Sequence, residues 1–245
     1  MLRREEAEIW LLNPEEITAL EPMADLAFPG GEGTCSPPSA GLNIPSHWVG
    51  RQVALRLLLG SYLGIDPGAV RLGRGAGGKP RLADSDKLHF SVSSSGGWWL
   101  AVFCGGEVGI DLEIVRATPG WRSVALSYFS EAETICLEAA ADENARSGLF
   151  LRYWTAREAY LKMEGIGLAG LESLRESGIP EGFWVKDLAL GEPLKACVAL
   201  RWPPAELRLC DWIEFEQRPN FARMRQTGFM DAPSRPTTRW RGIYA

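Results

Sequence analysis

Residues 107–115 read EVGIDLEIV, and this segment decides how the chain is divided. Asp111 and Glu113 alternate with Ile110 and Leu112, which predicts a strand with carboxylates on one face and apolar side chains on the other. Two neighbouring carboxylates repel each other unless a cation neutralises them, and Mg²⁺ prefers such oxygen ligands. For this segment alone, a solvated strand face without a metal is the simpler interpretation.

Helices and strands follow one another in a similar order before and after this segment. Strands are predicted at residues 8–12, 88–92, 98–104, 183–190, 195–202 and 207–215. Helices are predicted at residues 50–63 and 144–163, and after the capping sequences Asn13-Pro14 and Ser130–Glu133. This order predicts an α+β fold whose two halves meet near residues 105–108. The predicted parts are residues 1–106, residues 107–217 and a tail of residues 218–245.

A second segment, WTAREAYLK at residues 154–162, supplies a third carboxylate and a lysine. In a helix, Glu158 and Lys162 lie one turn apart on the same face. An exposed ion pair of this kind is common and is worth little by itself. Beside Asp111 and Glu113, however, Glu158 would complete a site for Mg²⁺, with Lys162 next to it. Such a group is suited to phosphoryl-type transfer, in which the cation and the lysine neutralise phosphate charge.

The composition excludes several classes of protein. The chain has 26 basic and 31 acidic residues, and its net charge of −5 argues against a general nucleic-acid-binding protein. Five widely spaced cysteines and two histidines form no zinc or disulfide pattern. The N-terminus lacks the features of a signal peptide, and no run of about 20 apolar residues could cross a membrane. We therefore expect a soluble, cytoplasmic protein that binds neither nucleic acid nor membrane.

Short motifs follow one another in a specific order between about residues 50 and 168. They are Gly78-Lys79-Pro80, Phe90-Ser-Val-Ser93, Val108–Glu113, Phe129-Ser-Glu-Ala-Glu133, and Trp154–Lys162 followed by Gly165-Ile-Gly-Leu168. Each motif is modest alone, but the ordered set resembles the surfactin-type 4′-phosphopantetheinyl transferases. That family moves the phosphopantetheine arm of coenzyme A onto a serine of an apo carrier protein and releases adenosine 3′,5′-bisphosphate.

The resemblance implies a fold and a set of site residues. Two similar α+β halves would be related by a pseudo-twofold axis, with the active site in the cleft between them. The first half would bind coenzyme A, and the second would carry the metal and the catalytic helix. The implied metal ligands are Asp111, Glu113 and Glu158. Glu158 would also activate the serine of the carrier protein, and Lys162 would stabilise the phosphate or protonate the leaving group.

The resemblance also implies how the substrates are bound. The residues implied to contact coenzyme A are Lys79, Pro80, Ser93 and Ser94. The implied partner is an apo acyl or peptidyl carrier protein of fatty-acid, polyketide or nonribosomal-peptide synthesis. We expect the enzyme to act as a monomer.

The sequence departs from the family pattern around one phosphate. Ser91 and Ser94 stand where the family usually has an Asn and the His that would contact the 3′-phosphate of coenzyme A. No Lys or Arg occurs between Arg4 and Arg51, where the family has a basic cluster. The 3′-phosphate is therefore either held loosely or bound by other cations. The candidates are Arg51, Arg56, Arg74, Arg81 and the tail, which has six arginines and one aspartate.

Other interpretations stay open at this point. A non-catalytic relative could bind a carrier protein or a nucleotide without transferring anything, and the missing His favours this alternative. A different Mg²⁺-dependent phosphoryl or nucleotidyl enzyme would account for the carboxylates but not for the ordered motifs. A Ser-His-Asp hydrolase is the weakest alternative, because the chain has no G-x-S-x-G motif.

Overall fold

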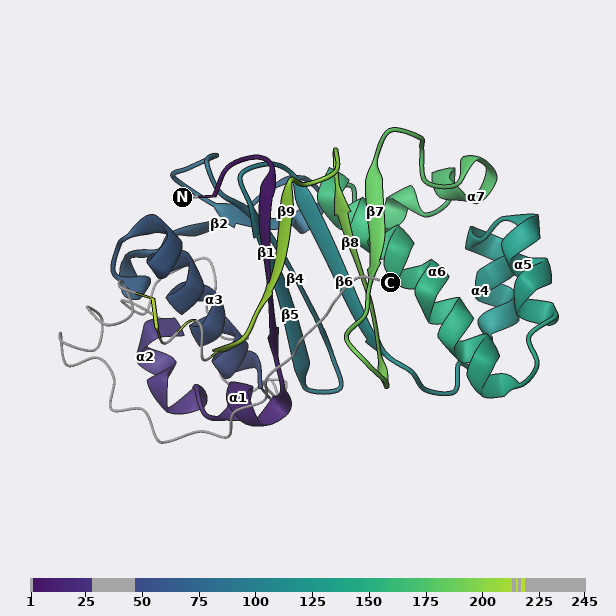
Figure 1. Cartoon of the computed structure of the whole chain (residues 1–245), viewed down its shortest axis with the longest axis horizontal. Coiled ribbons are helices and arrows are strands. Elements are labelled where there is room, and N and C mark those ends of the chain that lie inside the picture. Colours follow the sequence, from purple (N-terminus) through teal and green to yellow (C-terminus); the bar gives the residue numbers. More distant parts are fainter. Residues whose placement is uncertain (1, 28–46, 213–214, 216, 219–245) are drawn as a thin grey trace.

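The computed structural model describes residues 2–27, 47–212, 215, 217 and 218. All but the first residue of the predicted basic tail lies outside these residues. Two β-sheets lie between two layers of helices, with α1, α2 and α3 at one end and α4, α5 and α6 at the other (Figure 1). This mixed architecture is consistent with the predicted α+β class, while the pseudo-twofold axis stays a prediction.

The larger sheet belongs mainly to the first part of the chain. Its strands, in spatial order, are β4 (His89–Ser95), β5 (Trp98–Cys104), β1 (Glu6–Leu12) and β9 (Glu206–Cys210). The helices next to it are α1 (Pro14–Thr18), α2 (Ala24–Ala27) and α3 (Trp48–Leu63). Asn13 caps α1 as predicted, and Gly64 ends α3 with a φ of 69°. Buried side chains of α3 and this sheet form one hydrophobic core.

Short elements lie between the main helices and strands. They are the strands β2 (Leu72–Arg74) and β3 (Pro80–Leu82) and the 3₁₀ turns Glu21–Met23, Pro67–Ala69, Ala76–Gly78 and Leu168–Gly170. β2 and β3 form a small antiparallel hairpin. The hairpin carries a glycine loop at residues 75–79, which includes Gly78 and Lys79 of the motif noted above.

The smaller sheet and the remaining helices form the second part. Its strands, in spatial order, are β6 (Val108–Ile114), β8 (Leu194–Leu200) and β7 (Trp184–Leu188). The helices are α4 (Trp121–Tyr128), α5 (Glu131–Glu138), α6 (Glu143–Glu164) and α7 (Ser173–Ser177). The predicted capping box at Ser130 is confirmed, and Gly165 ends α6 in the left-handed conformation. None of the described helices combines the length and apolar character needed to span a membrane.

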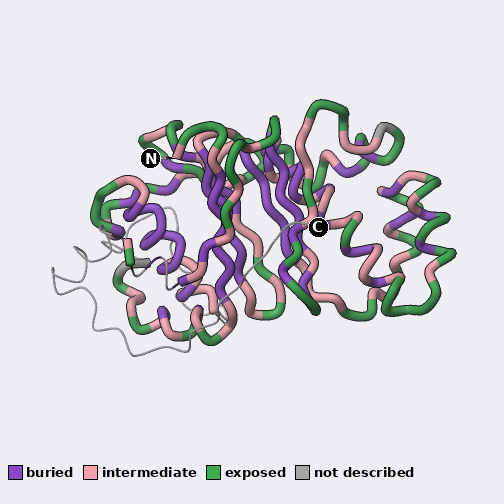
Figure 2. The backbone as a smooth tube through the Cα atoms, in the orientation of Figure 1, coloured by how far each residue is buried: buried purple, intermediate pink, exposed green. Residues whose placement is uncertain are grey.

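A second hydrophobic core lies between the two sheets. Ile110 and Leu112 of β6 are fully buried in it, against Ile9 of β1 and Val102 of β5. The central strands are accordingly buried along most of their length (Figure 2). The alternation predicted for residues 107–115 is therefore confirmed, because Asp111 lies on the opposite face of β6 and contacts α6.

The chain returns to the larger sheet after completing the smaller one. β9 lies parallel to β1, with Ile9 opposite Leu209, although it follows β7 and β8 in the sequence. Residues 206–210 thus join the sheet of the first part, so the segment predicted as residues 107–217 contributes to both sheets. The predicted division into parts stays a proposal.

Candidate active site

The close approach of β6 to α6 builds the candidate site. Gly109 of β6 lies against the backbone of α6, so that a Cβ at this position would be 1.9 Å from the carbonyl oxygen of Ala159. Only glycine allows this approach. Asp111, two residues further along the same face of β6, consequently lies within hydrogen-bonding distance of Lys162 on α6.

Asp111 is the most buried acidic residue of the candidate site, with 4% of its surface exposed. Its Oδ1 accepts hydrogen bonds from Lys162 Nζ at 2.6 Å and from Ser93 Oγ at 2.7 Å. Its Oδ2 is buried and has no hydrogen-bond partner among the residues that the structure describes. An orphaned carboxylate oxygen is costly to bury, which suits a residue whose remaining ligand is a cation.

Glu158 lies on the same face of α6 as Lys162, one turn earlier. Its Oε2 is 3.9 Å from Lys162 Nζ. Burial raises the pKa of the Glu158 carboxyl, and the negative charges of Asp111 and Glu113 raise it further, whereas Lys162 partly opposes this shift. The structure therefore brings Asp111, Glu158 and Lys162 together, and Glu113 follows Asp111 two residues further along β6.

The donor set of these residues fits a hard cation, although no complete metal site is assembled. Within the part of the chain that the structure describes, no cluster of three or more Asp, Glu, His or Cys side chains has the geometry to hold a metal. Lys162 lies between Asp111 and Glu158 instead and supplies a positive charge. The Asp111 Oδ2 atom nevertheless makes no hydrogen bond within the described part of the chain and could bind a cation. The Mg²⁺ site stays a prediction.

The serines of β4 lie beside β6, and the predicted contacts of Ser93 and Ser94 with coenzyme A stay a prediction. Ser93, predicted to contact coenzyme A, donates to Asp111 and accepts a hydrogen bond from Lys162 at 3.2 Å. Ser94, the other serine of this prediction, is exposed. Ser91 and Ser95 also contact β6, and the sequence interpretation missed this role. The period-2 spacing of the three serines was the signal that could have revealed it.

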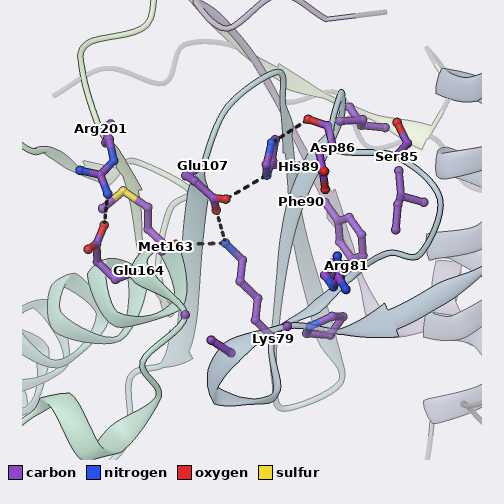
Figure 3. A pocket seen from close by; sticks show the side chains of 16 residues that line it. Lys79, Arg81, Ser85, Asp86, His89, Phe90, Glu107, Met163, Glu164 and Arg201 are labelled. Carbon is purple, nitrogen blue, oxygen red and sulfur yellow. Dashed lines mark hydrogen bonds and ion pairs between the residues drawn. The ribbon is translucent and has the colours of Figure 1, made fainter.

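Lys79 is held by the protein itself (Figure 3). Its Nζ donates to the carbonyl oxygens of Val108 and Met163 at 2.9 and 3.2 Å, and to the Glu107 carboxylate at 3.2 Å. Burial lowers the pKa of the Lys79 ammonium, although Glu107 opposes the shift. Lys79 thus ties the glycine loop to the start of β6 and to the last turn of α6.

Lys79 and Pro80 also line a cavity of about 340 Å³ beside the loop. His89 and Phe90 of β4 lie on another side of this cavity (Figure 3).

Arg51, the remaining residue predicted to bind coenzyme A, is on α3, and burial lowers the pKa of its guanidinium. Its Nε is buried without a hydrogen-bond partner, and no hydrogen bond between described residues links it to the carboxylates. That these residues bind coenzyme A stays a prediction.

Arg157 joins α6 to the start of α5. Its guanidinium donates to both Glu133 carboxylate oxygens, at 3.0 and 2.5 Å, and to the Tyr128 carbonyl oxygen at 3.1 Å. It also lies 4.6 Å from the centre of the Phe129 ring, as in a cation–π contact. Glu133, predicted only as a capping residue, therefore also holds the residue next to Glu158.

Comparison with known proteins supports the resemblance noted in the sequence. Residues 107–197 match the family model described as the 4′-phosphopantetheinyl transferase superfamily. The chain is 38% identical over 157 residues to the 4′-phosphopantetheinyl transferase HetI of Nostoc sp., a match that covers 62% of each chain. It is 30% identical over 117 residues to the 4′-phosphopantetheinyl transferase Sfp of Bacillus subtilis, covering 48% of this chain and 51% of the relative.

These matches cover the candidate site but not the whole chain. The family model includes Asp111, Glu113, Glu158 and Lys162. The chain spans about half to 62% of the length of the first curated relatives it matches. The predicted resemblance to 4′-phosphopantetheinyl transferases is confirmed over this region.

Proposed function

We propose that this chain, whose residues 107–197 match the 4′-phosphopantetheinyl transferase superfamily, transfers the phosphopantetheine arm of coenzyme A to a serine of an apo acyl or peptidyl carrier protein. The convergence of Asp111, Glu158 and Lys162 at the contact of β6 with α6 carries the proposal. The proposed enzyme acts as a monomer in the cytoplasm. Carrier proteins of fatty-acid, polyketide or nonribosomal-peptide synthesis are its proposed partners.

The transfer exchanges one bond to phosphorus for another. The serine oxygen of the carrier protein bonds to the phosphorus next to the pantetheine arm, while the bond from that phosphorus to the bridging oxygen breaks. Adenosine 3′,5′-bisphosphate leaves with the electrons of the broken bond. When bound by Asp111, Glu113 and Glu158, Mg²⁺ would neutralise the negative charge of the pyrophosphate.

Glu158 is the proposed acceptor of the serine proton. Its pKa is raised by burial and by the neighbouring carboxylates, so the ionised side chain is a stronger base than an ordinary glutamate. Lys162 Nζ lies 3.9 Å from Glu158 Oε2 and 2.6 Å from Asp111 Oδ1. It is placed to stabilise the phosphate oxygens and the charge that develops on the leaving bisphosphate.

Mass spectrometry of the carrier protein tests the proposal. Wild-type protein, Mg²⁺, coenzyme A and a panel of apo carrier proteins should yield a carrier that has gained phosphopantetheine. Glu158→Gln should reduce transfer at least about 100-fold while coenzyme A binding survives, because the amide cannot accept the proton. Glu143→Gln, on an exposed turn of the same helix, is the matched control and should transfer normally.

Two results would contradict this assignment. Normal turnover by Glu158→Gln would show that another group accepts the proton. Binding of coenzyme A by the wild-type protein without transfer to any carrier would favour the non-catalytic alternative.

A further inference from the structure

Alternate serines of β4 face the edge of β6. Ser91, Ser93 and Ser95 are spaced two residues apart, so their side chains project from the same side of the strand. β4 is the edge strand of the larger sheet, and β6 is the edge strand of the smaller one. The two strands contact each other, but no backbone ladder joins them within the described residues. Serine side chains make the hydrogen bonds at this junction.

Two of these serines accept hydrogen bonds from the backbone of β6. The Ile110 N–H donates to Ser91 Oγ, and the Ile114 N–H donates to Ser95 Oγ, both at 3.2 Å. Both contacts satisfy amides at the edge of a sheet that would otherwise need another acceptor. Ser91 and Ser95 are therefore equivalent as acceptors, since each binds one backbone amide of β6.

Ser95 has a second contact that Ser91 lacks. Its hydroxyl donates to Glu113 Oε2 at 2.8 Å, just as Ser93 donates to Asp111 Oδ1 at 2.7 Å. The Ser95 hydroxyl donates its single proton to Glu113 and accepts a hydrogen bond from the Ile114 amide. These two contacts together fix the orientation of the hydroxyl. Oε2 of Glu113 is thereby held, whereas no hydrogen bond to Oε1 occurs among the described residues.

We infer that Ser95 is a positioning residue that holds Glu113 in place beside Asp111, whereas Ser91 serves only to join the sheets. The inference rests on the proposed function, in which Glu113 is one of three carboxylates that bind a divalent cation. Hydrogen bonds from neighbouring groups orient metal-binding carboxylates, and their removal commonly weakens metal binding. The β4 segment would then contribute to the metal site as well as to the contact between sheets.

Substitutions of equal shape separate the hydroxyl from the bulk of the side chain. Ser95→Thr keeps a hydroxyl, whereas Ser95→Val has nearly the same shape without one, and both residues are favourable in strands. Ser91→Ala removes the matching backbone contact without touching a carboxylate. Mn²⁺ is titrated into each folded variant without coenzyme A or carrier protein. Electron paramagnetic resonance measures the concentration of free Mn²⁺, from which the dissociation constant is calculated. Thermal unfolding checks that each variant folds.

We expect Ser95→Val to bind Mn²⁺ about 10–100-fold more weakly than Ser95→Thr. Ser91→Ala should bind within about twofold of the wild-type protein, because it leaves both carboxylates held. In transfer assays, the Mg²⁺ concentration for half-maximal rate should rise for Ser95→Val but not for Ser91→Ala. If Ser95→Val does not fold, Ser95→Ala, which adds no bulk, provides the same comparison.

Three results would overturn the inference. They are equal Mn²⁺ binding by Ser95→Val and Ser95→Thr, equal losses in Ser91→Ala and Ser95→Val, and no Mn²⁺ binding by the wild-type protein. Failure of the proposed function is distinguishable from these results. A protein that binds Mn²⁺ through a Ser95-dependent site but transfers no phosphopantetheine would contradict the function and leave this inference standing.

Discussion

Gly109→Ala tests whether the close approach of β6 to α6 assembles the site. A Cβ at residue 109 would lie 1.9 Å from the Ala159 carbonyl oxygen and 2.4 Å from the Met163 amide nitrogen. Both are backbone atoms of α6 and cannot rotate away. Because ordinary van der Waals contact begins near 3.4 Å, α6 must move away from β6 by about 1.5 Å.

The displacement should affect both stability and transfer. It would stretch the 2.6 Å contact between Lys162 and Asp111 beyond hydrogen-bonding distance. Overpacking of this kind costs about 1–3 kcal/mol in the free energy of unfolding. Misplacement of a catalytic group by about 1 Å can reduce the rate about 100-fold, so we expect a loss of this size in kcat.

Urea unfolding and phosphopantetheine transfer, followed by mass spectrometry, measure these two effects. Gly148→Ala is the matched control on α6, since its Cβ would lie 3.6 Å from Lys195 Cε in ordinary contact. That variant should be stabilised by about 0.5–1 kcal/mol, because alanine favours a helix more than glycine does. Wild-type stability and transfer in Gly109→Ala would refute the role assigned to the β6–α6 contact.

Three further predictions concern side chains around the site. Burial raises the pKa of Glu133, but hydrogen bonds from Arg157 and Ser130 outweigh this and lower it below 4.5. The stability that Glu133 contributes should therefore be complete above about pH 4.5 and be lost as the pH falls through the lowered pKa. In urea unfolding, Glu133→Gln should be less stable than wild type at pH 7, and this difference should shrink as the pH falls below about 4.5. Lys79→Met should lower the free energy of unfolding, measured in urea, by about 2–3 kcal/mol, because the Val108 and Met163 carbonyl oxygens lose their donor. Unchanged stability together with a raised KM for coenzyme A would instead indicate that Lys79 binds coenzyme A directly. Arg51→Met should raise the KM for coenzyme A about tenfold but not that for dephospho-coenzyme A if Arg51 binds the 3′-phosphate, and equal changes for both donors would exclude this role.

Local patterns predicted most elements of the fold. The alternation in residues 107–115 placed Ile110 and Leu112 in the core and Asp111 on the opposite face, because side-chain direction in a strand depends only on position. Capping residues likewise marked helix ends, since a cap bonds to amides a few residues away. The pairing of β9 with β1 followed from no such pattern, because the two strands are far apart in the sequence.

In the candidate site, too, local sequence patterns predicted some features, and others depend on the fold. The order of the motifs and the spacing of one helical turn predicted Asp111, Glu158 and Lys162 as a group. The contacts of Lys79 with backbone carbonyls of two distant segments depend on the folded arrangement of those segments. Motif matching reports which residue types occur, whereas the partner of a lysine or a serine depends on which acceptors packing brings within about 3 Å.

The serines of β4 make this distinction clearest. Their spacing is visible in the sequence and places three hydroxyls on one side of a strand. Their partners on β6 follow only from the meeting of two edge strands from different sheets. The sequence therefore determined the chemistry available at the site, and the contact between the sheets decided how that chemistry is arranged, because hydrogen bonds require particular distances and angles that local sequence does not set.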